Sequence, residues 1–287
     1  MTSPAPDAAG GGLPVKGKSE LFQRVVSALV LAPIALGATW AGGFVFGLGM
    51  MVLAVLVFYE WATVSGHDAW HPETLAGYGG VAAIVFIAAL GDIEMSVVFI
   101  AALAAASLGL WLSHGRLRWH AAGMLYASLI GVALVALRND GGFGLLAVVW
   151  LFAVVWATDI LAYFVGRAVG GPKLWPRVSP KKTWSGFLGG LTAAIVAGIV
   201  VVHFGGIDRL WPVAIVSGLV SIVAQGGDLL ESAFKRHFGV KDSSRLIPGH
   251  GGVMDRVDGL AAAAVGAAII GWLHAGFAAP AEGLFTW

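Results

Sequence analysis

Long apolar runs constrain this chain of 287 residues more than any other feature of its sequence. Stretches of about twenty residues with few or no charges recur along it, and about twenty apolar residues are what a helix needs to cross a bilayer. Hydrophobic residues make up 58% of the chain and charged residues only 11%, whereas soluble domains carry roughly 25% charged residues. We therefore predict an all-α, polytopic integral membrane protein.

Counting about twenty residues per span predicts nine transmembrane helices. Their expected ranges are 21–41, 43–64, 75–91, 94–113, 120–137, 143–169, 184–204, 210–236 and 255–277. A secretory signal peptide is the competing interpretation of the first run, but that run is long and a second follows almost at once. We expect a flexible cytoplasmic tail (1–19), an N-terminal transmembrane packing half (20–140) and a C-terminal transmembrane half (141–287) that holds the catalytic groups.

The basic residues indicate how these helices are oriented. If the tail is cytoplasmic and nine helices cross, every Lys and Arg lies on the cytoplasmic side except Arg138 and Arg209. We therefore predict a cytoplasmic N-terminus and a C-terminus outside. The two loops richest in polar residues, 166–184 and 235–258, then face the cytoplasm. The chain has no cysteine, which excludes disulfides, thiolate catalysis and cysteine metal sites.

Charged side chains on the predicted helices are the first candidates for chemistry. A charge inside an apolar helix costs about 3 kcal/mol on insertion scales, so it is usually paired or functional. One face of the eighth predicted helix carries four polar residues at helical spacing: Asp228, Glu231, Ser232 and Lys235. A structural pair, either Asp228–Lys235 or Glu231–Lys235, explains this face as well as a functional role does.

Asp228 and Asp255 matter most as a pair. Asp255 could simply cap the last predicted helix, but that helix begins on the face where the eighth one ends, so the two carboxylates can meet. Mg²⁺ is typically held by one or two carboxylates together with substrate phosphates. A two-metal site would clamp the attacking and leaving oxygens in phosphoryl or nucleotidyl transfer.

The glycine-rich turn before Asp255 favours an anionic ligand. Gly249, Gly251 and Gly252 let the backbone approach a ligand closely, and basic residues flank the turn. His250 could act as a base, as a hydrogen-bond donor to phosphate or as a plain loop residue, and we favour the donor.

Two other acids and one loop keep more than one interpretation. Asp159 either pairs with Arg167 or reaches a polar cavity. Glu60, in "FYEW", is best interpreted as part of an interfacial anchor belt. The basic loop 166–184 sets topology, touches anionic lipid or supplies cations to a substrate.

Four stretches resemble the motifs of one family. "SAFKRHFGVKDSSRLIPGHGGVMDRVD" (232–258) resembles the signature of phosphatidate cytidylyltransferases, or CDP-diacylglycerol synthases. "DILAYFVGR" (159–167), "SPKKTWSG" (179–186) and "QGGDLLES" (225–232) resemble further motifs of that family. The resemblance covers residues 159–258 well and the first 140 residues only in hydropathy. It implies transfer of CMP from CTP to phosphatidate, which gives CDP-diacylglycerol and pyrophosphate for phospholipid biosynthesis.

The resemblance also implies roles for particular residues. The expected metal ligands are Asp228, Asp255 and Asp258, with two Mg²⁺ ions, or K⁺ beside Mg²⁺, as cofactors. The expected catalytic residues are Asp228, Asp255, Lys235 and Arg256. The expected substrate-binding residues are Lys173, Ser179, Lys181, Lys182, Ser232, Arg236, Lys241, His250, Gly251 and Gly252.

The implied partners are CTP and phosphatidate as substrates, membrane lipid and a second copy of the chain, with no nucleic acid. We expect an integral protein of the bacterial inner membrane with its active site on the cytoplasmic face. One alternative is a CTP-dependent polyprenol kinase, which would release no pyrophosphate. Another is an ion-coupled transporter with Asp159 and Asp228 along its path, although the sequence shows no inverted repeat.

Overall fold

The computed structural model describes residues 16–112, 114–115, 117–249 and 251–287, without the side chains of residues 16–25, 28 and 31. Nine long helices, a short final helix and one two-stranded sheet make up this part of the chain. In chain order they are α1 (Lys16–Ala41), α2 (Gly43–Val64), α3 (Pro72–Ala89), α4 (Ile93–Leu112), α5 (Arg118–Asn139), α6 (Gly144–Val169), β1 (Lys173–Trp175), β2 (Ser179–Thr183), α7 (Trp184–Phe204), α8 (Leu210–His237), α9 (Met254–Ala275) and α10 (Glu282–Phe285).

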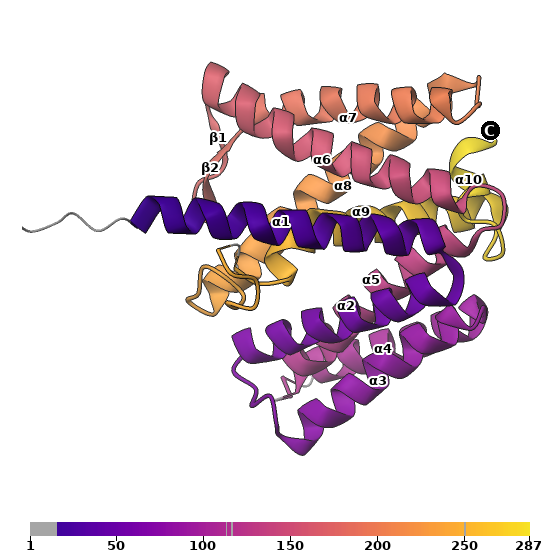
Figure 1. Cartoon of the computed structure of the whole chain (residues 1–287). Coiled ribbons are helices and arrows are strands. Elements are labelled where there is room, and N and C mark those ends of the chain that lie inside the picture. The colour runs from indigo at the N-terminus through magenta and orange to yellow at the C-terminus, as the bar shows by residue number, and fades with distance from the viewer. Residues whose placement is uncertain (1–15, 113, 116, 250) are drawn as a thin grey trace, which may run out of the picture.

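The long helices run along one broad direction, as Figure 1 shows. The β1–β2 hairpin and the loop between α8 and α9 therefore lie at one end of the molecule, here called the hairpin end, while α10 and the C-terminus lie at the opposite end. Within the described residues, eight helices, α2 to α9, are long and apolar enough to cross a membrane. The predicted class, an all-α polytopic membrane protein, is confirmed. The number of crossings and the sides on which the termini lie stay predictions.

Each predicted span overlaps one of the nine long helices, and the boundaries differ by a few residues. The first break falls where it was expected, because Gly42 has a φ of 62° and ends the run of α1. Most of the proposed tail, residues 1–15, lies outside the described part of the chain. The division into two functional halves stays a prediction.

The hairpin was not predicted. Strand β1 pairs antiparallel with β2, with Lys173 opposite Thr183 and Trp175 opposite Ser179. Strands of three and five residues are too short to show an alternating pattern in the sequence. Thr183 then begins α7, because its Oγ1 accepts the N–H of Gly186 at 3.1 Å.

Helix α5 lies at the centre of the packed helices. All seven of its residues from 131 to 137 are buried, and five of them join one continuous core with side chains of α2, α3, α6, α8 and α9. Many large apolar side chains on the outer helices are exposed in the isolated chain; Leu29, Trp40, Phe164 and Leu273 are examples. This distribution suits a protein that presents its outer surface to lipid rather than to water.

Small residues bring α6 and α7 into close contact. A Cβ added to Gly190 would lie 2.8 Å from the carbonyl oxygen of Thr158, and one added to Gly186 would lie 2.7 Å from that of Ala162. Helices in lipid associate through such small residues because their backbones can then approach closely. The close approach fixes the spacing of two of the helices that frame the candidate site.

Gly227 makes a similar contact between α8 and α9. A Cβ at Gly227 would overlap Ala262 and lie 3.1 Å from the carbonyl oxygen of Asp258, whereas a Cβ at Gly226 would meet no atom within 4 Å. We predict that Gly227→Ala destabilises the protein by about 1–3 kcal/mol through overpacking. Gly226→Ala, the matched control, should be neutral or stabilising by up to about 1 kcal/mol. Thermal unfolding in detergent measures both, and equal melting temperatures would contradict this account of the helix contact.

Candidate active site at the hairpin end

A polar cavity of about 750 Å³ lies between α6, α7, α8 and the hairpin. Its charged lining residues are four cations and two acids: Arg167, Lys173, Lys181, Lys182, Asp159 and Asp228. The cations come from the end of α6 and from the two strands, while the acids come from the membrane-spanning helices. This excess of positive charge beside an apolar bundle is suited to a ligand that carries several negative charges.

Asp228 pairs with Lys182 in the wall of the cavity. Its Oδ2 forms an ion pair with Lys182 Nζ, and its Oδ1 accepts a long hydrogen bond of 3.4 Å from Ser232 Oγ. The side chains of Lys182 and Asp228 are 28% and 29% exposed. Both groups are therefore accessible to a ligand in the cavity.

The polar face of α8 is present as predicted, and Lys235, in the last turn of the helix, pairs with two acids. Lys235 Nζ lies 2.7 Å from Glu231 Oε2 and 2.6 Å from Asp255 Oδ1. Of the two structural pairs considered from the sequence, the structure contains Glu231–Lys235, while Asp228 pairs with Lys182 instead. Lys235 is 8% exposed, so a buried cation between two carboxylates links α8 to the start of α9.

Asp255 closes the start of α9 as a capping residue. Its Oδ2 accepts the N–H groups of Gly252 at 2.8 Å and of Ser243 at 3.0 Å. This reach back to a backbone N–H just before the helix resembles one half of a capping box, without the reciprocal bond, because the N-cap residue is Val253. With Lys235 also on Oδ1, both oxygens of Asp255 are engaged within the protein.

The structure corrects the interpretation of Glu60 that was made from the sequence. Its side chain is 0% exposed, so it is not part of an interfacial anchor belt. The neighbouring Trp61 also points inward, where its ring stacks on Phe234 with centroids 3.8 Å apart. Glu60 instead accepts hydrogen bonds from Ser243, Ser244, Val253 and Met254. These residues lie in and beside the loop between α8 and α9 (238–253), here called the signature loop. The sequence gives no signal for this role, because Glu60 is separated from its four partners by 183 to 194 positions in the chain. Only the folded structure shows that they are in contact.

Asp258 lies one turn further along α9, where that helix contacts Gly227 of α8. The close contact of Gly227 with the backbone of Asp258 sets the two helices together at this level. Asp228, Asp258 and Asp159 are near enough for their charges to interact. Asp159 lines the cavity, and Arg167 Nη1 donates to the Tyr163 hydroxyl at 2.9 Å rather than to Asp159. Of the two interpretations of Asp159, the structure favours the cavity.

The donor set suits a hard divalent cation at one edge of the cavity. Asp228 and Asp258 supply carboxylate oxygens, the ligands that Mg²⁺ prefers, and Asp228 is accessible from the cavity. Asp255 would join them only by giving up its contact with Lys235. Among the described residues, no group of three or more His, Asp or Glu side chains is already arranged as a metal site. The predicted metal ligands therefore stay a prediction.

The other predicted residues divide into two groups. Lys173, Lys181, Lys182 and Asp228 line the cavity together. Arg167, Thr183 and Gln225 line it too, although none of them was among the predicted binding residues. The second group of predicted residues does not line it: Ser179, Ser232, Lys235, Arg236, Lys241, Gly251, Gly252, Asp255, Arg256 and Asp258. His250 lies outside the described residues.

Three further members of the second group, besides Ser232, Lys235 and Asp255, have structural contacts. Arg236 Nη1 donates to the carbonyl of Val240 at 2.7 Å, which closes the turn after α8. Gly251 has a φ of 86° and pairs with Ile247 in an isolated bridge. A Cβ on Gly252 would lie 2.5 Å from Glu60 Oε2. The two glycines thus permit packing within the loop, whether or not they also permit a phosphate to approach.

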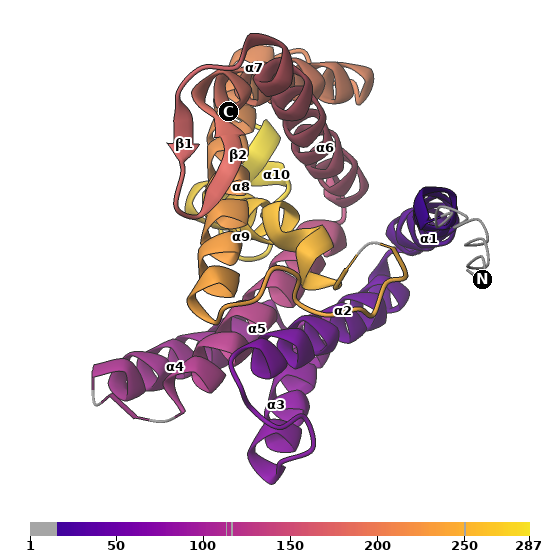
Figure 2. The same cartoon turned by 90° about the vertical axis from the view of Figure 1, so that its left-hand side faces the viewer.

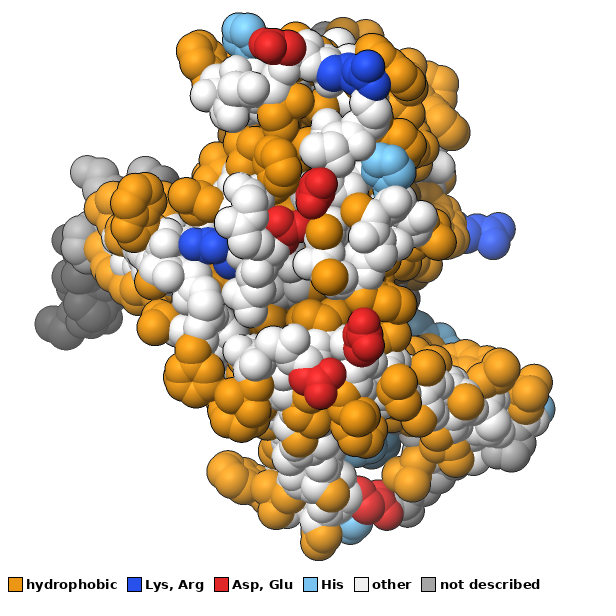
Figure 3. All heavy atoms as spheres, turned by 90° about the vertical axis from the view of Figure 1, so that its right-hand side faces the viewer, with side chains coloured by type: hydrophobic (Ala, Val, Ile, Leu, Met, Phe, Trp, Pro, Cys, Tyr) orange, Lys and Arg blue, Asp and Glu red, His pale blue; other side chains and the backbone are white. Residues whose placement is uncertain are grey.

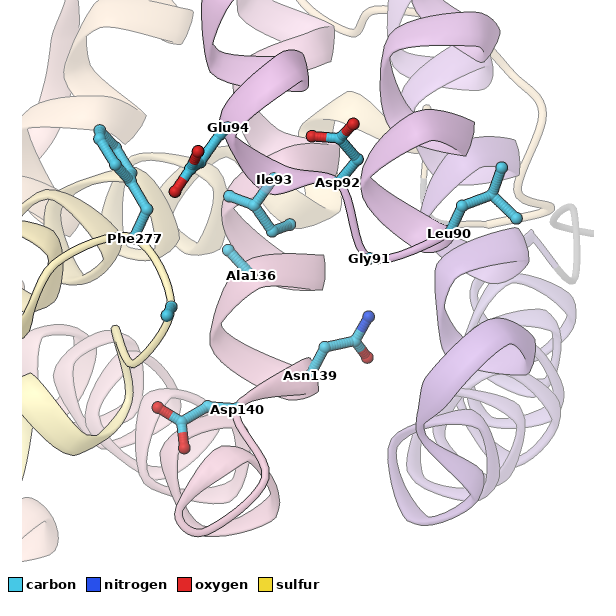
Figure 4. Close-up of a pocket in the computed structure, with 10 residues that line it drawn as sticks. Leu90, Gly91, Asp92, Ile93, Glu94, Ala136, Asn139, Asp140 and Phe277 are labelled. Carbon is cyan, nitrogen blue, oxygen red and sulfur yellow. The ribbon is translucent and has the colours of Figure 1, made fainter.

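A second cavity, of about 580 Å³, lies at the opposite end. Figure 3 shows that end, where a few acidic and a few basic side chains stand among apolar and uncharged ones. Figure 4 shows the cavity itself, lined by Asp92, Glu94, Asn139 and Asp140 together with apolar residues. Its lining contains no Lys or Arg among the described residues, so it does not suit an anionic ligand.

The fold and the site define a polytopic membrane protein with a cavity at one end of its helices. Basic side chains line this cavity, and carboxylates lie at its edge. Residues 22–274 match the cytidylyltransferase family. This chain belongs to that family.

Curated relatives carry a more specific name. "Phosphatidate cytidylyltransferase" of Brucella abortus biovar 1 (strain 9-941) is 46% identical over 248 residues, covering 86% of this chain and 91% of the relative. The protein of the same name from Brucella suis biovar 1 (strain 1330) has the same identity and coverage. A shorter match, 43% over 136 residues, covers 47% of this chain and 52% of the "Phosphatidate cytidylyltransferase" of Staphylococcus haemolyticus (strain JCSC1435).

Substitution of Lys181 tests whether the cavity binds CTP. A hydrogen bond to a charged group contributes about 1.5–3 kcal/mol, so we predict that Lys181→Ala weakens CTP binding about tenfold or more. Arg177→Ala is the matched control, because Arg177 is an exposed cation of the same segment that does not line the cavity. It should change the dissociation constant less than about twofold. Calorimetric titration with CTP measures both, and equal losses in the two variants would place the nucleotide elsewhere.

Proposed function

We propose that this chain is a phosphatidate cytidylyltransferase, which transfers CMP from CTP to phosphatidate and releases CDP-diacylglycerol and pyrophosphate. The observation that carries the proposal is the cavity in which Lys173, Lys181 and Lys182 face Asp228 at the end of a membrane-spanning bundle. The family match and the names of the relatives support it. Such a position suits one substrate dissolved in water and a second one anchored in the bilayer.

The reaction needs little covalent chemistry from the protein. A phosphate oxygen of phosphatidate attacks the α-phosphorus of CTP and forms a new P–O bond. The bond from that phosphorus to the oxygen bridging to the β-phosphate breaks, and its electron pair leaves with pyrophosphate. Catalysis then depends on holding two anionic substrates in line and on neutralising the charge of their phosphates.

The cavity residues are arranged for these tasks. Lys173 and Lys181 approach from the two strands of the hairpin, and Lys182 lies beside Asp228. In the proposed mechanism Lys182 exchanges its contact with Asp228 for one with the triphosphate. Lys235 holds the start of α9 against α8 through Asp255, so it orients the acids from within the protein.

We propose that Asp228 and Asp258 hold Mg²⁺, with Asp255 as the third predicted ligand. When bound, the metal would neutralise charge on the phosphates of CTP. The predicted second metal ion, or K⁺, would lie in the same acidic region.

We further propose that the hairpin end faces the cytoplasm of a bacterial cell, in the inner membrane, and that the chain acts as a homodimer. CTP is a cytoplasmic metabolite, and both basic segments lie at this end. The positive-inside rule supports the same orientation.

The direct test is an assay of the purified chain with CTP, phosphatidate and Mg²⁺. We predict CDP-diacylglycerol and pyrophosphate in equal amounts. Asp228→Asn and Asp255→Asn should each lower turnover by at least about a hundredfold, because each removes a charge that orients metal or cation. Both variants should still insert and fold, which size-exclusion chromatography checks.

Three outcomes would change the proposal. A phosphorylated lipid without pyrophosphate would favour the polyprenol kinase. Ion-driven uptake by reconstituted vesicles, with no lipid product, would favour the transporter. Near-normal turnover in either Asp variant would remove that residue from the site.

The orientation can be tested by cysteine labelling, since the natural chain has no cysteine. Arg177 lies between β1 and β2 at the hairpin end, and Asp208 lies between α7 and α8; both are exposed. We predict that Arg177→Cys reacts with a membrane-impermeant maleimide only after cells are opened, whereas Asp208→Cys reacts in intact spheroplasts. The reverse pattern would invert the proposed topology.

A further inference from the structure

Glu60 is a buried acid to which the family resemblance assigns no role, and the role inferred from the sequence, an interfacial anchor, is wrong. It lies in α2, far in sequence from the other polar residues at the hairpin end, and its side chain is 0% exposed. Each of its oxygens accepts one hydroxyl and one backbone N–H. Oε1 accepts Ser244 Oγ at 2.6 Å and Val253 N at 2.8 Å, while Oε2 accepts Ser243 Oγ at 2.8 Å and Met254 N at 2.7 Å.

All four partners of Glu60 can donate, which is the environment a carboxylate requires. Two of them are free N–H groups at the start of α9, where the helix dipole also stabilises a negative charge. No Lys or Arg forms an ion pair with Glu60 among the described residues. Hydrogen bonds from the signature loop and the start of α9 therefore stabilise this buried negative charge.

Asp255 holds the other side of the same loop. Ser243 donates its hydroxyl to Glu60 and its backbone N–H to Asp255, and Gly252, whose N–H Asp255 accepts, has no room for a Cβ beside Glu60. Two carboxylates, those of Glu60 and Asp255, therefore both bind this loop. Figure 2 shows the path of this loop, which leaves α8 and runs past the start of α9 towards α2 and α1.

From this arrangement we propose that Glu60 is a positioning residue for the reaction. It fixes the signature loop and the first turn of α9, and through them the position of Asp255 against Lys235 and of Asp258 against Asp228. Helix α2, from the half of the chain expected only to pack, thereby sets the geometry of the acids on α8 and α9. The inference rests on the proposed function for its kinetic part and on the contacts alone for its structural part.

Glu60→Gln is the sharpest change. An amide keeps the size of the side chain, but its NH₂ group replaces one acceptor oxygen. The serine hydroxyl on that side can turn round and accept, whereas the backbone N–H of Val253 or Met254 cannot. One backbone N–H therefore loses its partner in either orientation of the amide, and the start of α9 loosens.

Asp140 provides a matched control at the opposite end. It is also a buried carboxylate, 8% exposed, with four donors, but all four are backbone N–H groups, whereas Glu60 accepts two N–H groups and two hydroxyls. Its Oδ2 accepts those of Ala281 and Glu282, both at 3.0 Å, and its Oδ1 accepts those of Gly142 and Phe143, both at 3.2 Å. Asp140→Asn disturbs the same kind of contact without touching the hairpin end.

The experiment compares the two variants with the natural chain in detergent. We expect both to lower the melting temperature by similar amounts. Only Glu60→Gln should lower kcat, by about tenfold or more, as loss of a supporting contact does in other sites. The KM for CTP should stay within about twofold, because the cavity cations are untouched. Hydrogen exchange should accelerate across residues 242–256 in Glu60→Gln, and near 140–144 and 279–286 in Asp140→Asn.

Several results would overturn the inference. Equal kcat values in the two variants would show that Glu60 has a structural role only. Unchanged hydrogen exchange across 242–256 in Glu60→Gln would show that Glu60 does not hold the loop. If Glu60→Gln does not fold, Ser243→Ala combined with Ser244→Ala removes two of the four donors, and an unchanged kcat there would also refute the inference. If the natural chain makes no CDP-diacylglycerol, the proposed function fails, while the exchange measurement still decides whether Glu60 holds the loop.

Discussion

The charged end of this molecule depends on one constraint: a carboxylate buried in an apolar protein must be met by donors or cations. The chain satisfies it with a connected set of contacts. Glu60 is met by the start of α9 and two serines, Asp255 by the same loop and Lys235, and Asp228 by Lys182 of the hairpin. Since each of these contacts joins different elements, they hold α2, α8, α9 and the hairpin in one arrangement.

This arrangement separates two kinds of charge. Glu60, Lys235 and Asp255 are enclosed by protein and fix the backbone, whereas the hairpin lysines and Asp228 line an accessible cavity. A cytidylyltransferase needs both, because its chemistry consists mainly of holding phosphates in line. The rigid contacts supply the geometry, and the accessible groups supply the charge that the substrates meet.

The apolar runs were enough to predict the helices, because a span is a local property of about twenty residues. The polar face of α8 was also predictable, since helical spacing alone places Glu231 and Lys235 together. The same spacing could not decide between Lys235 and Lys182 as the partner of Asp228, because Lys182 comes from another element. Glu60 was misinterpreted for a related reason: its neighbours in sequence indicate an interface, while its contacts lie on a distant loop.

A structure of the chain with Mg²⁺ and a non-hydrolysable CTP analogue would test the central claim most directly. The account predicts that the triphosphate lies in the cavity between α6, α7, α8 and the hairpin, in contact with Lys181 and Lys182, with Glu60 still holding the signature loop. An analogue bound in another place, or one in the cavity while Lys182 remains paired with Asp228 and apart from the phosphates, would contradict it.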